Sequence, residues 1–200
     1  SRVLTVGPQN VNLGKGIDYE FTSYDLYFDT LFASQVRHQT DIPTVQTRAL
    51  AIMNHYENPT DNGHRTFSSY FTGANPDQLK LDSVQYFIKG RLQPVRAYNP
   101  KPKAEKIISE HELVKALTTI NKEPQDLGQS DKHNLNNYTN TYLTARELAR
   151  GNYFYDLSDA EPQLRLGFSG TRTDNHTINT YVWSKKIVVA DPQEGIRVIL

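Results

Sequence analysis

The 200-residue sequence contains no cysteine. That absence excludes disulfide bonds, thiolate nucleophiles and zinc sites built on cysteine. An excess of either charge is also missing, because 22 Lys and Arg residues balance 22 Asp and Glu residues, and neither end carries a basic tail. Proteins that grip nucleic acid by its phosphates normally show a basic excess. The composition therefore argues against direct nucleic-acid binding.

Long apolar runs are absent as well. No stretch approaches the roughly 20 residues of a membrane-spanning helix, and the opening SRVLTVGPQN has no apolar centre of signal-peptide length. We therefore expect no membrane span and no signal peptide in this sequence. Hydrophobic residues make up only 37%, but 12 Tyr, 8 Phe and 1 Trp supply large apolar bodies. Length and composition together fit one loop-rich domain.

Motifs that would indicate catalysis are missing. The glycine-led segment from Gly7 to Lys15 lacks the spacing of a phosphate-binding loop and its following Ser or Thr. The GFSG around Ser169 misses the spacing of a nucleophile elbow. No two histidines stand at i, i+2 or i, i+4 among His38, His55, His64, His111, His133 and His176. We therefore expect no catalytic, cofactor-binding or metal-binding residues, and a protein that is not an enzyme.

Several weaker candidates have a plainer interpretation. His111 stands between two glutamates that point to other faces of a predicted helix, so we expect a half-buried histidine at the edge of the core. Residues 156–161, DLSDAE, lack the regular ladder of a calcium loop, and a turn held by Asx side chains is favoured. The tyrosines could form a sugar-stacking platform, but core and interface packing is the better default. Asn137 and Asn175 match the glycosylation pattern, which matters only in a secreted protein.

Alternating apolar residues predict a mainly β protein. Residues 47–56 are apolar on both faces, which suits a buried strand of a sandwich. For residues 23–34 the periodicity does not separate strand from helix, and residues 1–22 are expected to form an irregular arm. Further strands are predicted at residues 66–73, 80–88, 152–157, 163–168 and 178–184, with two short ones in residues 185–200.

The stretch from Lys80 to Lys103 has a distinctive structural pattern but no residues that suggest catalysis. Val84, Tyr86 and Ile88 share one face of a strand, and Lys89-Gly90 forms a turn. Three prolines at 94, 100 and 102 then confine the chain to an edge strand or an extended segment. A stiff arm of this kind can lie across a neighbouring subunit at little cost in ordering. We therefore expect residues 94–103 to serve assembly more than folding.

Two helices are predicted in a polar insertion that spans residues 104–150. Residues 104–120 place apolar side chains at helical spacing, and residues 141–150 end at Gly151, a common C-terminal signal. The expected fold is a jelly-roll β-sandwich with two short α-helical insertions, formed as one domain over residues 1–200.

The order of segments in the C-terminal 120 residues resembles a known family. A strand with the turn YFIKGRLQP precedes a helix-bearing insertion, and a glycine then leads into an aromatic, Asp and Leu segment. The later parts of the series are Leu164 to Phe168, Thr171 to Thr177, Tyr181 to Trp183, and Ile187 to Val198. This series resembles the second jelly roll of the double-jelly-roll major capsid proteins of polintons, virophages and adenovirus-like viruses.

The resemblance implies a structural coat protein that self-assembles into an icosahedral shell inside the host cell and resides in the virion. Its implied partners are copies of itself and other capsid subunits, as a trimer or pentamer. Subunits of that family carry two jelly rolls, whereas this sequence has room for one. A single-jelly-roll relative, a penton-type subunit and an unrelated β-sandwich therefore stay open.

Two other function classes remain. A non-catalytic β-sandwich that recognises carbohydrate or a host surface would need an exposed aromatic platform. A cupin-like enzyme would need clustered ligands, and His55 and His64 offer no close spacing.

Overall fold

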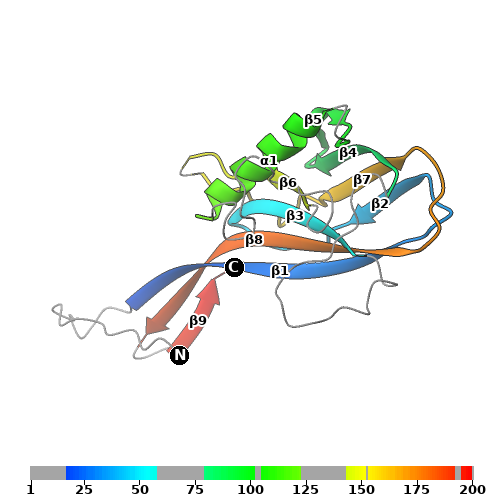
Figure 1. The fold of residues 1–200 in the computed structure, drawn as a ribbon. Coiled ribbons are helices and arrows are strands. Elements are labelled where there is room, and N and C mark those ends of the chain that lie inside the picture. The colour runs from blue at the N-terminus through cyan, green and yellow to red at the C-terminus, as the bar shows by residue number, and fades with distance from the viewer. Residues whose placement is uncertain are drawn as a thin grey trace, which may run out of the picture.

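The computed structural model describes residues 17–57, 79–101, 105–122, 143–151, 153–191 and 195–199. These residues form nine strands and one helix (Figure 1). In chain order they are β1 (Ile17–Leu31), β2 (Arg37–Asp41), β3 (Ala49–Glu57), β4 (Leu81–Ile88), β5 (Arg91–Tyr98), α1 (Lys106–Thr119), β6 (Leu143–Glu147), β7 (Gln163–Phe168), β8 (His176–Asp191) and β9 (Gly195–Ile199).

The strands form two antiparallel sheets. Sheet A has the order β1-β8-β3-β6, with β9 also paired to β8, and sheet B has the order β2-β7-β4-β5. The antiparallel pairs are β1·β8, β2·β7, β3·β6 and β4·β5, so the strands are matched inward from β1 and β8 to the β4–β5 turn. The chain is thus one long hairpin folded over, with successive strand pairs placed alternately in the two sheets. This topology is a jelly roll, and it confirms the predicted mainly β sandwich.

The main core lies between the two sheets. Alternate residues of each strand face it, as in Leu164, Leu166 and Phe168 of β7, which are all buried. On β3 the residues Ile52 and Tyr56 face this core. Met53, on the other face of the same strand, packs in a second cluster. The expectation that residues 47–56 form a strand buried on both faces is confirmed.

Helix α1 supplies the cover for that second face. Its residues Leu113, Ala116 and Leu117 pack with Met53 of β3 and Ala145 of β6 on the outer side of sheet A. The predicted helix over residues 104–120 is therefore confirmed. The second predicted helix, over residues 141–150, is wrong, because Leu143–Glu147 forms strand β6 and pairs with β3.

Other boundaries also differ from expectation. Residues 17–22 belong to β1 and not to an irregular arm, and residues 23–31 continue the same strand. The separate strands expected at residues 178–184 and just after them form one strand, β8. In the range 152–157, where a strand was expected, Tyr153 and Tyr155 make only isolated bridges. The strand predicted at residues 66–73, as well as His64, His133 and Asn137, lies outside the described residues.

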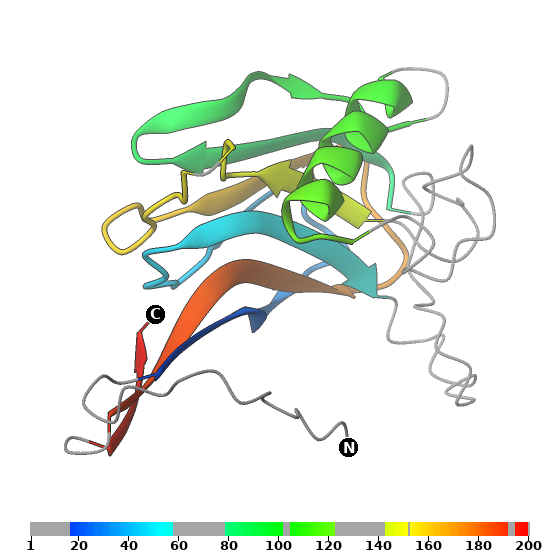
Figure 2. The ribbon, with the colours of Figure 1, turned by 90° about the vertical axis from the view of Figure 1, so that its left-hand side faces the viewer.

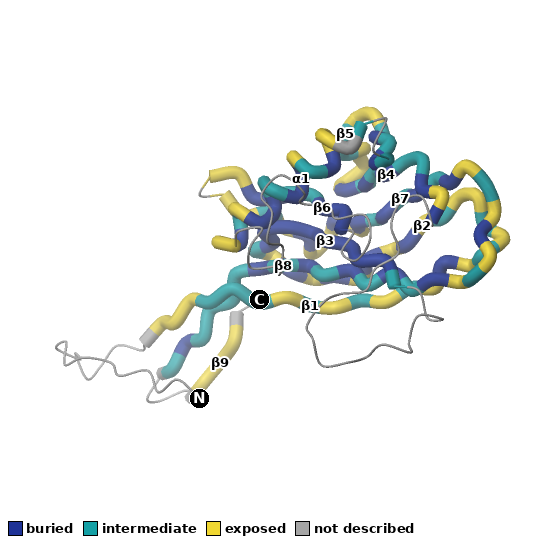
Figure 3. The backbone as a smooth tube through the Cα atoms, in the orientation of Figure 1, coloured by how far each residue is buried: buried dark blue, intermediate teal, exposed yellow. Residues whose placement is uncertain are grey.

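Strands β1 and β8 are much longer than the others, with 15 and 16 residues. Their far ends, together with β9, extend beyond the body of the sandwich in two perpendicular views (Figures 1 and 2). Figure 3 shows β9 and the beginning of β1 as largely exposed. We call this three-stranded part, made of residues 17–22, 185–191 and 195–199, the projecting sheet.

Candidate assembly surfaces

The β4–β5 hairpin forms the tip of the folded ribbon. Lys89 and Gly90 both have positive φ, 50° and 73°, as a tight two-residue hairpin turn requires. Before the turn, Val84, Tyr86 and Ile88 are fully buried, as their alternation predicts.

The proline-bearing segment after this turn is an edge strand and not a free arm. It pairs with β4, and the side-chain amide of Gln85 donates to the carbonyl oxygens of Pro94 (2.9 Å) and Val95 (3.1 Å) where the ladder is irregular. Tyr98, at its end, is only 2% exposed. The predicted edge geometry is confirmed, but the arm interpretation is wrong, because residues 94–98 help to complete the sheet and the core.

A polar network crosses the core between the sheets. The hydroxyl of Tyr86 on β4 donates to Asn54 Oδ1 on β3 at 2.6 Å, and the amide of Asn54 donates to Thr180 Oγ1 on β8 at 2.7 Å. Burial, followed by the nearby Tyr98 and Tyr56, holds the pKa of Tyr86 well above its usual value. The hydroxyl therefore stays protonated and, as the donor to Asn54, links sheet B to sheet A.

In the described part of the chain, the histidines and the acidic turn singled out from the sequence form no common site. His111 is exposed, so the expected half-buried position is wrong, because its neighbour Glu112 turns inward instead and binds Arg146 at 2.7 Å. The DLSDAE segment holds an Asx turn, in which Asp156 Oδ1 accepts from the Ser158 amide at 2.9 Å. These Ser158 hydrogen bonds lower the pKa of Asp156. The described residues contain no group of three or more His, Asp or Glu that could hold a metal ion.

Another polar group ties β1 to β2 and was not noticed in the sequence. Asp29 Oδ2 lies 2.9 Å from His38 Nε2 and 2.7 Å from Thr40 Oγ1. Burial raises the pKa of Asp29, but hydrogen bonds from Thr40, the Thr30 amide and His38 outweigh it and leave the pKa below its usual value. Because the Thr40 hydroxyl bonds to the carboxylate, the group braces a corner of the sandwich.

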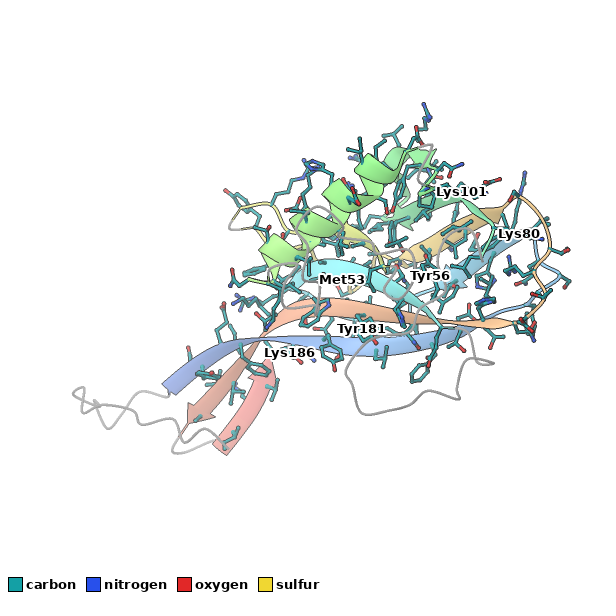
Figure 4. The ribbon with its side chains drawn as sticks, in the orientation of Figure 1. Met53, Tyr56, Lys80, Lys101, Tyr181 and Lys186 are labelled. Carbon is teal, nitrogen blue, oxygen red and sulfur yellow. The ribbon has the colours of Figure 1, made fainter. Side chains whose placement is uncertain are left out.

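An aromatic cluster occupies the outer face of sheet A beside α1. The ring of Tyr24 meets Trp183 at 4.9 Å and Tyr181 at 5.5 Å, with interplanar angles of 52° and 68°. Figure 4 shows Tyr181 on β8, near Met53 of β3. The tilted rings present no shared flat surface, so the cluster fits packing better than stacking against a sugar ring.

A groove of about 720 Å³ runs between the edge strands β5 and β6. Lys89, Arg91 and Arg150 line it, together with the exposed ring of Tyr153. Arg146 also lines the groove but is bound to Glu112. The groove's lining is mainly cationic and aromatic, with Glu147 as the one carboxylate among the lining residues.

The projecting sheet carries the other notable surface. Strand alternation places six apolar side chains on one of its faces: Tyr19 and Phe21 of β1, Val188 and Ala190 of β8, and Ile196 and Val198 of β9. Tyr19, Ile196 and Val198 are 53%, 78% and 53% exposed, and the other three are half-buried. The rings of Tyr19 and Phe21 stack at 6.2 Å. We call these six side chains the uncovered face. The period-two pattern of each strand is visible in the sequence, but it predicts a common face only when the pairing of β1 with β8 is known.

No protein-family model and no curated protein matches the sequence. Among solved structures, the quasi-atomic model of the PBCV-1 virus capsid matches with a TM-score of 0.51 and 10% identity, over 92% of this chain and 52% of that chain. PBCV-1 VP54, fitted into a reconstruction of the virophage Sputnik, gives 0.48 and 10%, with the same coverage. The major capsid protein P2 of bacteriophage PM2 gives 0.34 and 12%, over 88% of this chain and 47% of that one.

The comparison with the PBCV-1 capsid, at this low identity, shows a shared fold. The class is therefore a jelly-roll β-sandwich with the fold of a viral capsid protein, and the resemblance drawn from the sequence is confirmed at that level. This chain spans about half the length of the solved structures it matches.

Proposed function

We propose that this protein is a structural capsid subunit that assembles with copies of itself, and with other capsid subunits, into an icosahedral shell. The observation that carries the proposal is the jelly-roll fold, with sheets of order β1-β8-β3-β6 and β2-β7-β4-β5, together with its match to the PBCV-1 capsid at a TM-score of 0.51. Because one fold can serve many functions, the surfaces must support the proposal as well.

The surfaces support a role in protein–protein contact. The sequence has equal numbers of positive and negative side chains, so copies approach without long-range repulsion. The exposed apolar residues include a contiguous set on the projecting sheet. Such patches are typical of protein–protein contact sites. No helix among the described residues is long and apolar enough to cross a membrane.

Finer parts of the proposal follow from the same fold. The chain forms one jelly-roll domain, and its half-length match to the solved structures suits one of two jelly rolls in a capsid subunit. Trimers or pentamers are the expected closed units, assembled inside the host cell and located in the virion. The role is structural and not enzymatic.

Light scattering coupled to size-exclusion chromatography, over a wide range of concentration, tests this function. The expected result is a trimer or pentamer that grows into rings or shells visible by negative-stain microscopy. A chain that remains monomeric at every concentration would contradict the proposal. Glycan binding that is lost in Tyr24→Ala would instead favour the carbohydrate-binding alternative.

A further inference from the structure

The uncovered face is the continuation of the sandwich interior. Along β1 and β8 the pairing runs without a shift from Leu31↔His176 to Ile17↔Ala190. Odd-numbered residues of β1 and even-numbered residues of β8 therefore share one side throughout. On that side Val182 lies fully buried in the main core, and six residues further along β8 Val188 lies on the uncovered face.

One ion pair lies at the boundary between the main core and the uncovered face. Lys186 Nζ lies 2.9 Å from Asp25 Oδ1, and Gln46 donates to the same carboxylate (Lys186 is labelled in Figure 4). Sheet B covers the core side of sheet A up to this point. Beyond it, no strand or helix of the described part of the chain faces the six side chains, and none of them belongs to a core cluster.

The two faces of the projecting sheet differ in charge. The opposite side carries the apolar Ile187 and Val189, but there Glu20 pairs with Arg48 at 2.9 Å and Lys185 at 3.3 Å, and Asp18 and Arg197 flank Val189. On the uncovered face the nearest charge is Lys186, already paired with Asp25. A partner is therefore selected there by apolar shape and not by charge.

We propose that the uncovered face packs against the uncovered face of a second copy of this chain, related by a two-fold axis. The reason is continuity: inside the sandwich the same pleated side of sheet A is covered by another sheet, and sheets pack face to face about 10 Å apart. A second copy supplies a sheet of the same pleat, with an apolar face and no unpaired charge. The inference rests on the proposed assembly function and names its contact surface.

The size of the face sets the strength of the contact. Three strands about 4.8 Å apart and five residues long at about 3.4 Å each give roughly 240 Å² of flat area. A standard interface buries about 800 Å² per partner. One such contact is therefore weak. Because copies within a trimer or pentamer are not related by two-fold axes, the contact joins copies of neighbouring units, and it becomes effective when the other contacts of the shell hold those units together.

Crosslinking tests the arrangement directly, because the chain has no cysteine and a single one can be introduced cleanly. Val188→Cys places a thiol on the middle strand β8, at the centre of the uncovered face, where two copies related by the two-fold axis come closest. Val95→Cys places a control thiol on β5, where Val95 is 87% exposed. A bismaleimide that spans about 10 Å matches the spacing of packed sheets. We expect covalent dimers with Val188→Cys and at least tenfold fewer with Val95→Cys at high protein concentration. Equal yields, or no dimer with Val188→Cys, would overturn the proposal.

A second variant separates this surface from the assembly function itself. Val198→Glu adds a charge to the face, whereas Val95→Glu adds the same charge elsewhere, and both sites are exposed enough to leave the circular dichroism and melting temperature unchanged. We expect the concentration needed for assembly to rise at least tenfold for Val198→Glu alone. Normal assembly of Val198→Glu overturns the surface and leaves the capsid function standing. A wild-type chain that neither assembles nor crosslinks overturns both.

Discussion

At the scale of single residues, the core of this protein depends on a polar network as well as on apolar packing. Tyr86, Asn54 and Thr180 connect a strand of sheet B to two strands of sheet A, and all three side chains are at most 1% exposed. Buried hydrogen bonds contribute modestly when made and cost more when one partner is removed.

Tyr86→Phe should therefore lower the free energy of unfolding by about 1–3 kcal/mol, because it leaves the buried Asn54 Oδ1 without its donor. Chemical denaturation monitored by circular dichroism measures the change. Tyr153→Phe is the control, since that side chain is 82% exposed and should change stability little. Equal stability of the two variants would show that the network does not hold the sheets together.

His55 gives the protein a predictable response to acid. Burial lowers the pKa of this histidine below its usual value, against a smaller opposing influence from Glu57. The unfolded chain then binds a proton more tightly than the folded one, so stability is complete above the unfolded pKa of about 6.5. It is lost progressively as the pH falls from that value through the folded pKa.

We accordingly expect the melting temperature to fall between about pH 7 and pH 5, and to fall less in His55→Gln. The His111→Gln variant serves as the matched control, since His111 is exposed. A drop of the same size in wild type and His55→Gln would assign the acid sensitivity to other groups.

At the scale of elements, the β4–β5 turn shows how a local rule supports the fold. Gly90 adopts φ of 73°, and a Cβ there would meet nothing within 4 Å. The cost of Gly90→Ala is therefore purely conformational, about 1–2 kcal/mol in the free energy of unfolding. Gly170→Ala is the control, because its backbone is not in the left-handed region and its Cβ would meet only the Lys80 side chain at 3.8 Å. Urea denaturation of both variants would show no difference if the turn were not strained.

The same hairpin shows what the sequence predicts well. Period-two alternation identified β4 and β7, and a glycine after lysine identified the turn, because these signals are local. The prolines correctly indicated an edge strand. Whether that strand joins its own sheet or a neighbour depends on Gln85 and on the burial of Tyr98, which are tertiary contacts.

Strand β6 shows why local signals fail. The segment TYLTARELAR is rich in helix-forming residues, yet β6 lies beside β3 in sheet A, and its Leu143 and Ala145 pack against α1. Pairing with β3 and cover by α1 outweigh the small intrinsic preference for helix. The candidate site was equally hidden, since the uncovered face combines β1 with β8 and β9, more than 150 residues away in the chain.

At the scale of the whole molecule, the jelly-roll topology explains both the buried core between the sheets and the uncovered face of the projecting sheet. Folding the ribbon over places sheet B against only part of the long strands β1 and β8, so the excess length becomes the projecting sheet (Figure 1). The two sheets thus cover each other within the sandwich, but no second sheet of the described residues covers the uncovered face. Charge is balanced over the chain, and the uncovered face itself carries none that is unpaired.

This distribution predicts how assembly responds to salt. Contacts made by ion pairs weaken as salt screens them, whereas apolar contacts persist and become stronger in excluded salts such as sulfate. Light scattering during a titration with sodium chloride, and then with sodium sulfate, should show association that is unchanged in the first and promoted in the second. Val198→Glu should lose the promotion and Val95→Glu should retain it. Assembly that dissolves as sodium chloride rises would place the contact on charged surfaces such as the groove lined by Lys89, Arg91 and Arg150.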